Sequence, residues 1–153
     1  MSIKNVVFDF GQVLVHYEPE YMVRQFASDE SDVKILTEVV FDRLYWDKLD
    51  KGKITDEEVK KSIRSRVPEE LKEISCTIYD NWINNLTPVQ GMQKLIHDIH
   101  KSGKKMYLLS NISTGFKEGY CNVEWINKLF SCFDGMVFSG EIGIVKPNVE
   151  IFE

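Results

Sequence analysis

The sequence IKNVVFDFGQVL, residues 3–14, decides how the rest of the chain can fold. Residues 3–8 form a short apolar run rich in β-branched side chains, which is typical of a strand buried in a parallel sheet. Asp9 follows this run directly, and Gly11 lets the chain turn. Open α/β sheets bind ligands beyond the carboxyl ends of their strands, so Asp9 lies where a ligand is expected.

Two later runs are also typical of buried strands, KMYLLS at residues 105–110 and MVFS at residues 136–139. Helices are expected at residues 92–99, where apolar residues recur at i, i+3, i+4 and i+7, and then around Phe116, over residues 124–130 and from Pro147. Alternating strands and helices predict an α/β fold, a Rossmann-like parallel sheet with right-handed crossovers.

The block from His16 to Thr87 contains no convincing strand and reads as helical. A helix is expected from Pro19, a second over residues 33–44, and a third from the capping box formed by Thr55 and Glu58. A fourth begins near Pro68. The block is too long for one crossover, which predicts a core of residues 1–15 and 88–153 and a separate helical layer of residues 16–87.

Composition excludes several classes of protein. The chain has 153 residues and a formal net charge of −5. It lacks the broad cationic field that binding to nucleic acid or to an anionic membrane needs, so neither partner is expected. No apolar run approaches the roughly 18–20 residues of a membrane helix, and the N-terminus does not resemble a signal peptide. Three cysteines without a CxxC pair favour reduced, mostly buried thiols in a cytoplasmic protein.

Polar residues follow each expected strand: Asp9 after the first, Ser110 and Asn111 after the second, and Lys146 after the third. A parallel sheet would bring them together at one edge. A carboxylate, a hydroxyl, an amide and an ammonium group suit phosphoryl transfer. Asp9 would attack phosphorus, and the others would hold the phosphoryl oxygens and offset their charge.

Three short motifs in this chain resemble those of the haloacid dehalogenase-like (HAD) hydrolases. They are VVFDFGQVL at residues 6–14, LLSN at residues 108–111 and GIVKP at residues 143–147. They occur in the family's order, and the helical block stands where the family's C1 cap is inserted. The first motif, together with residues 46–62, looks most similar to the glucose-1-phosphate phosphatase-like branch.

The resemblance implies a Mg²⁺-dependent phosphatase acting on a small phosphorylated metabolite, such as a sugar phosphate. Asp9 would be the nucleophile and a Mg²⁺ ligand, and the backbone carbonyl of Gly11 would also bind the metal. The implied phosphate-binding set is the Ser110 hydroxyl, the backbone amides near Gly11, Gln12 and Asn111, and Lys146, which would also pair with Asp9.

The chain departs from the family pattern in two places. Phosphatases of the family carry a second Asp two residues after the nucleophile as general acid and base, and here that residue is Gly11. His16 and Glu18 are the next titratable side chains, and histidine is the type that titrates nearest neutral pH. The fourth, acidic motif would lie beyond Glu153. We therefore expect either a longer chain that carries this motif or a truncated, non-catalytic remnant. An exposed sheet edge would make a homodimer understandable.

Other readings stay open. Hydrolysis of a carbon–halogen bond by the same carboxylate needs neither a metal nor the second Asp, so a 2-haloacid dehalogenase is the alternative enzyme. Residues 47–58 partly match an EF-hand loop, but Leu49 and Lys51 stand where carboxylates are needed, which favours a turn before a capped helix. The aromatic residues of the helical block are expected mainly in its core, with a substrate-facing role as the alternative: Tyr45, Trp46, Tyr79 and Trp82.

Overall fold

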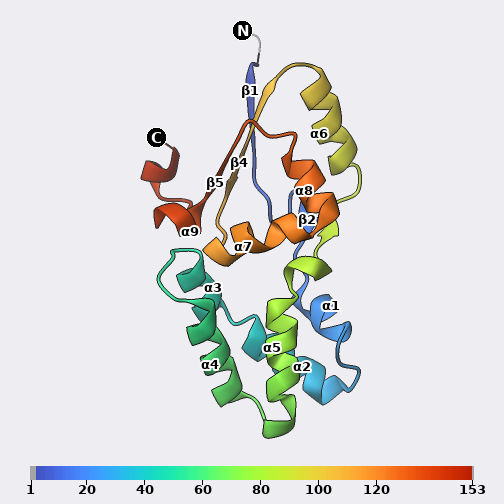
Figure 1. Ribbon diagram of the computed structural model, residues 1–153, viewed down its shortest axis with the longest axis vertical. Coiled ribbons are helices and arrows are strands. Elements are labelled where there is room, and N and C mark those ends of the chain that lie inside the picture. The colour runs from blue at the N-terminus through green and yellow to red at the C-terminus, as the bar shows by residue number, and fades with distance from the viewer. Residues whose placement is uncertain (1–2, 153) are drawn as a thin grey trace.

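A three-stranded parallel sheet organises the computed structural model, which describes residues 3–152 (Figure 1). The strands are β1 (Asn5–Phe8), β4 (Lys105–Ser110) and β5 (Gly135–Phe138), in the order β1-β4-β5. Phe8 lies opposite Leu108, and Ser110 opposite Phe138. The predicted α/β class and all three predicted strands are confirmed. Parallel pairing brings the carboxyl ends of the strands to one edge, above the helical part of the molecule.

Helices α6 (Met92–Lys101) and α8 (Glu124–Phe130) pack on one side of this sheet (Figure 1). Ile96 of α6 and Phe130 of α8 are buried there. The other face is open among the described residues, since Val7 is 60% exposed. The expectation of a buried first strand is therefore wrong for this face, because side chains alternate between faces and the helices cover only one.

Short elements complete the sheet-containing part. Helix α7 (Thr114–Gly119) follows β4 and buries Phe116 against Phe10, with ring centroids 4.9 Å apart. Helix α9 (Ser139–Ile142) follows β5 directly. The helix expected from Pro147 begins at Val149 and is a 3₁₀ helix, and the others of that type lie at Tyr120–Asn122, Glu69–Leu71 and Ile83–Asn85.

We call the elements between β2 and β3 the helical layer. It consists of α1 (Pro19–Arg24), α2 (Glu30–Val40), α3 (Arg43–Leu49), α4 (Asp56–Arg66) and α5 (Lys72–Asp80), with the 3₁₀ helices Glu69–Leu71 and Ile83–Asn85. The predicted capping box is confirmed: the Glu58 N–H donates to Thr55 Oγ1, and the Thr55 N–H donates to the Glu58 carboxylate. No helix within residues 3–152 has both the length and the apolar character needed to cross a bilayer.

The helix predicted over residues 33–44 is wrong at its end. Helix α2 stops at Val40, and α3 begins at Arg43. Asp42 lies between them in an extended conformation, and its carboxylate accepts a hydrogen bond from the Leu44 N–H at 2.9 Å. An aspartate that caps a new helix ends the apolar periodicity that suggested one continuous helix.

Two short strands that the sequence did not reveal connect the two parts of the chain. Strand β2 (Val15–His16) pairs antiparallel with β3 (Thr87–Pro88). The boundaries predicted at residues 16 and 87 both fall in this two-stranded ribbon. Two-residue strands carry no period of their own, so only the pairing of distant segments defines them.

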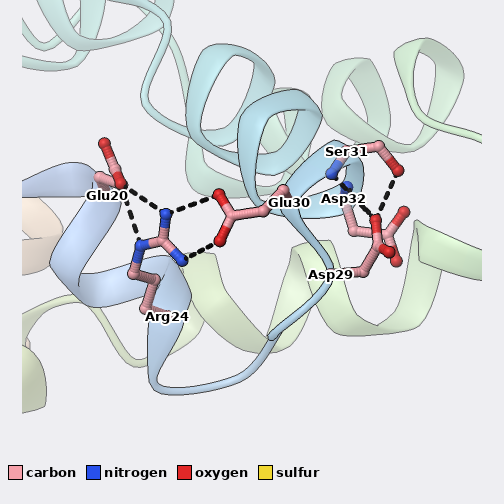
Figure 2. Close-up of polar contacts among 6 residues, drawn as sticks. All are labelled: Glu20, Arg24, Asp29, Glu30, Ser31 and Asp32. Carbon is pink, nitrogen blue, oxygen red and sulfur yellow. Dashed lines mark hydrogen bonds and ion pairs between the residues drawn. The ribbon is translucent and has the colours of Figure 1, made fainter.

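An ion-pair cluster fixes the first turn of the helical layer (Figure 2). The Arg24 guanidinium donates to Glu20 at 2.9 Å and to both carboxylate oxygens of Glu30 at 2.9 Å. Asp29 caps α2 by accepting from the Ser31 N–H at 2.9 Å. The pairing lowers the pKa of Glu30. These groups are exposed, so they orient α1 against α2 and add little stability.

A close seam joins the helical layer to the sheet-containing part. The Ser139 hydroxyl, which is fully buried, donates to the carbonyl of Asp50 at 2.6 Å. Beside it, Gly52 has a φ of +61°, and a Cβ added there would lie 2.5 Å from the carbonyl oxygen of Gly140. Only glycine fits both this backbone conformation and this approach.

The seam predicts a difference between two glycine substitutions. Gly52→Ala should lower the free energy of unfolding by ~2–4 kcal/mol, through backbone strain and the clash with Gly140. Gly103→Ala should cost only ~1–2 kcal/mol, because Gly103 has a φ of +74° but nothing within 4 Å of its added Cβ. Urea unfolding of both variants measures the difference. Equal losses of unfolding free energy would contradict the close contact between Gly52 and Gly140.

Candidate active site

Asp9 lies just beyond the carboxyl end of β1, where its carboxylate has two partners. The backbone N–H of Phe10 donates to Oδ1 at 2.8 Å, and the Lys146 ammonium contacts Oδ2 at 2.7 Å. The Asp9 side chain remains 44% exposed. A carboxylate fixed by two donors and still open to solvent can approach a ligand with little reorganisation.

Lys146 is placed by Asn111. The Lys146 N–H donates to Asn111 Oδ1 at 2.7 Å, and Asn111 Nδ2 donates back to the Lys146 carbonyl at 3.0 Å. The Lys146 ammonium also donates to the carbonyl of Leu109 at 2.9 Å. The side-chain amide of Asn111 is thus used to hold the loop that carries Lys146, a positioning contact that motif spacing did not reveal.

Ser110 ends β4 and is only 2% exposed. Its hydroxyl makes no hydrogen bond with the described residues and is not among their fully buried polar atoms, and Ser110 lines a cleft of about 460 Å³. Gly11, Gln12 and Asn111 line the same cleft. A hydroxyl without a protein partner is available to a ligand.

The loop after Asp9 is shaped by Gln12. Gln12 has a φ of +58°, which is uncommon outside glycine and marks a strained turn. Its N–H donates to the Val15 carbonyl at 2.8 Å, and its side chain donates to the Tyr17 carbonyl at 2.9 Å. Both donors of Gln12 are therefore engaged within the protein. The N–H and the carbonyl of Gly11 make no hydrogen bond with residues 3–152.

Asp9 and Lys146 do not line this cleft. They border a second hollow over the open sheet face, together with Val7, Tyr107 and Val137. The fold brings all six site residues predicted from the sequence to one sheet edge, but it divides them between two hollows. Asp9 and Lys146 lie at the open sheet face, and the other four line the cleft: Gly11, Gln12, Ser110 and Asn111. His16 and Glu18 line neither hollow.

Aromatic side chains of the helical layer form one wall of the cleft. Trp46 and Trp82 pack edge to face with ring centroids 5.1 Å apart, and Tyr17 lies 5.8 Å from Trp46. Tyr45 and Tyr79 are buried and do not line the cleft, whereas Trp82 is also buried but lines it. The four aromatic residues named from the sequence thus divide between core and cleft. Tyr17 was not identified, because a single tyrosine after the first motif carries no pattern.

Three charged residues of the helical layer also line the cleft, and the motifs gave no sign of them: Arg43, Asp47 and Asp50. Burial, and then the nearby Asp47 carboxylate, raise the pKa of Asp50 from 3.8 to about 6, while Arg43 acts in the opposite direction. Burial and then Asp50 raise the pKa of Tyr17. The Asp50 carboxylate makes no hydrogen bond with the described residues.

The partial EF-hand match has a structural explanation. Asp47 and Leu49 lie within α3, and the Glu58 carboxylate is used in the capping box of α4. Within residues 3–152, no three histidine, cysteine, aspartate or glutamate side chains gather as a metal centre.

Two oxygen ligands could nevertheless share a hard cation. The Asp9 carboxylate is partly exposed, and the Gly11 carbonyl accepts no hydrogen bond from the described chain. Mg²⁺ commonly takes one or two carboxylates, keeps several waters and completes its shell with substrate phosphate. The two residues therefore fit a Mg²⁺ ion bound jointly with phosphate, and they do not form a preformed cage.

Comparisons with known proteins agree with this picture. No family model matches the chain. D-ribitol-5-phosphate phosphatase from Bacteroides thetaiotaomicron is 26% identical over 161 residues, covering 99% of this chain and 74% of the relative.

Solved structures show the same fold. A HAD family enzyme from B. thetaiotaomicron, in complex with magnesium and inorganic phosphate, matches with a TM-score of 0.67 and 24% identity, over 99% of this chain and 76% of that one. L-2-haloacid dehalogenase from Xanthobacter autotrophicus matches with a TM-score of 0.63 and 16% identity, over 99% and 62%. The chain therefore has the HAD-like fold, and its similarity to a curated phosphatase supports the HAD-like superfamily.

The raised pKa of Asp50 predicts a pH-dependent effect on stability. Because the folded chain binds this proton more tightly than the unfolded chain does, ionised Asp50 destabilises the fold above pH about 6, and protonation removes the penalty as pH falls. Asp50→Asn should therefore stabilise the protein by ~1–2 kcal/mol at pH 7.5, after allowance for partial exposure. The gain should shrink between pH 7 and pH 4.5.

Thermal unfolding across this pH range measures the effect. Glu38→Gln, which neutralises an exposed carboxylate of α2, is the matched control and should show no such trend. A gain for Asp50→Asn that does not change with pH would contradict the assignment.

Proposed function

We propose that this chain is a HAD-like phosphatase that hydrolyses small sugar or polyol phosphates through an aspartyl-phosphate at Asp9. One observation carries the proposal: the Asp9 carboxylate, paired with Lys146 at 2.7 Å, stands at the same sheet edge as Ser110, whose hydroxyl has no hydrogen-bond partner among the described residues. A nucleophile and a cation thus lie on one side of this sheet edge and a hydroxyl group on the cleft side, and a phosphate bound at the edge would have to reach both. The similarity to D-ribitol-5-phosphate phosphatase supports this substrate class.

The chain's own residues divide the work as follows. An Asp9 oxygen attacks phosphorus as the bond to the alcohol breaks, and water then cleaves the acyl-phosphate to give inorganic phosphate and free Asp9. Lys146 offsets the negative charge of carboxylate and phosphoryl group. The Ser110 hydroxyl and the Gly11 N–H donate to phosphoryl oxygens, while Gln12 and Asn111 hold the two loops in place.

Mg²⁺ would be held by the Asp9 carboxylate and the Gly11 carbonyl together with the phosphate. When bound, it would neutralise charge between the nucleophile and the phosphoryl group. Gly11 occupies the position of the family's second Asp and cannot transfer a proton, so the alcohol must receive its proton from another group. We propose residues 16–87 as the cap that closes over this reaction, with residues 1–15 and 88–153 as the core.

A carboxylate nucleophile predicts that Asp9→Asn removes turnover. The amide is isosteric but a poor nucleophile, so kcat on ribitol 5-phosphate should fall by ~10³-fold or more. Glu38→Gln should retain wild-type activity. The unfolding temperature shows whether each variant is folded, and folded Asp9→Asn with more than a tenth of the wild-type rate would overturn the assignment.

Metal dependence separates the phosphatase from the alternative dehalogenase, which the shared fold with L-2-haloacid dehalogenase keeps open. EDTA should abolish phosphate release, and Mg²⁺ should restore it, because Lys146 alone offsets only part of the combined negative charge of Asp9 and a phosphate dianion. Chloride release from L-2-chloropropionate that survives EDTA, with no phosphate release under any condition, would favour the dehalogenase.

A further inference from the structure

Asp50 is held by its backbone and left free at its side chain. Its carbonyl accepts from the buried Ser139 hydroxyl at 2.6 Å, and its N–H donates to the Trp46 carbonyl at 2.9 Å. Asp50 lines the cleft, and its carboxylate makes no hydrogen bond with residues 3–152. A fixed, partly buried acceptor without a protein partner is prepared for donors from a ligand.

The same cleft contains a second unpartnered polar group. Ser110 is 2% exposed as a residue and lines the cleft, and its hydroxyl makes no hydrogen bond with residues 3–152. The cleft therefore offers one free polar group at the proposed phosphate end and another from the helical layer. This pairing fits a ligand with a phosphate at one end and hydrogen-bond donors along the rest.

The cleft wall around Asp50 is aromatic and carries a net negative charge. Trp46, Trp82 and Tyr17 supply apolar ring surface, which suits the C–H faces of a polyol. Asp47 and Asp50 contribute two negative charges and Arg43 one positive charge, which leaves −1. Arg43 pairs with Asp47 at 3.7 Å, so its positive charge offsets Asp47 and only partly that of Asp50.

We propose that Asp50 determines substrate specificity by accepting hydrogen bonds from hydroxyl groups of the alcohol portion, so that the site selects neutral polyhydroxylated phosphate esters over those with a carboxylate. The inference rests on the proposed function. A carboxylate on the alcohol portion would face Asp50 in a partly desolvated cleft, and two anions there repel each other strongly. A hydroxyl in the same place donates to Asp50 instead.

The groups facing Asp50 set the pH at which this selection operates. Asp47 and Arg43 lie on α3, which Asp50 directly follows, and Tyr17 approaches from the segment after β2. Because burial and then Asp47 raise the pKa of Asp50 to about 6, against the opposite effect of Arg43, the preference should weaken below that pH, where Asp50 becomes neutral.

A matched substrate pair tests the proposal. Ribitol 5-phosphate and ribonate 5-phosphate differ only in a terminal CH₂OH or COO⁻ group, so the titration of their phosphates cancels in the ratio of kcat/KM. The wild type should prefer the ribitol ester by about tenfold or more at pH 7.5, and Asp50→Asn should reduce the preference to within about threefold. Asp47→Asn should change the ratio less, because the Asp47 side chain is 61% exposed.

Equilibrium binding separates this inference from the proposed reaction. Tryptophan fluorescence, with Trp46 and Trp82 in the cleft wall, reports binding of each ester to Asp9→Asn and to Asp9→Asn/Asp50→Asn with Mg²⁺ present. If the ratio of the two affinities differs between these variants but the wild type hydrolyses neither ester, the proposed phosphatase activity is wrong and the role of Asp50 in selecting the ligand stands. An unchanged ratio in both assays, or no binding of either ester, would overturn the role of Asp50.

Discussion

Parallel pairing of β1, β4 and β5 is the constraint on which the candidate site depends. With Phe8 opposite Leu108 and Ser110 opposite Phe138, the polar residues that follow each strand leave the sheet at the same edge. Asp9 and Lys146 are 137 positions apart in the sequence, yet their charged atoms lie 2.7 Å apart. A shift of one residue in either pairing would turn each side chain to the other face and separate these groups.

The seam between the two parts of the chain links packing to recognition. Ser139 follows β5 and donates to the backbone of Asp50, so the strand that helps to place Lys146 also places the cleft wall. The same contact leaves the Asp50 carboxylate partly buried and unpartnered, an arrangement that lowers stability. Sites that bind ligands commonly retain such strained or unsatisfied groups, because the bound ligand provides the missing hydrogen-bond partner.

Sequence patterns performed best where one physical cause acts locally. The three strands were found from apolar runs, and the start of α4 from the capping pair Thr55 and Glu58. One prediction failed locally: the cap that Asp42 forms two residues before Leu44 divides α2 from α3. Two failed where distant contacts decide: the β2–β3 ribbon depends on pairing across the chain, and the exposure of Val7 on which sheet face is covered.

The sequence by itself determined the α/β class, the order of strands and the residues at the strand ends, because periodicity and strand-end chemistry are written within a few neighbouring residues. Only the tertiary structure decided which of those residues meet. It turned Asp9 toward Lys146, and it used Gln12 and Asn111 to hold two loops in place. It left the Ser110 hydroxyl without a hydrogen-bond partner among the described residues. It also brought Asp50 into the cleft, since burial and unsatisfied hydrogen-bonding capacity arise only when segments far apart in the chain pack together.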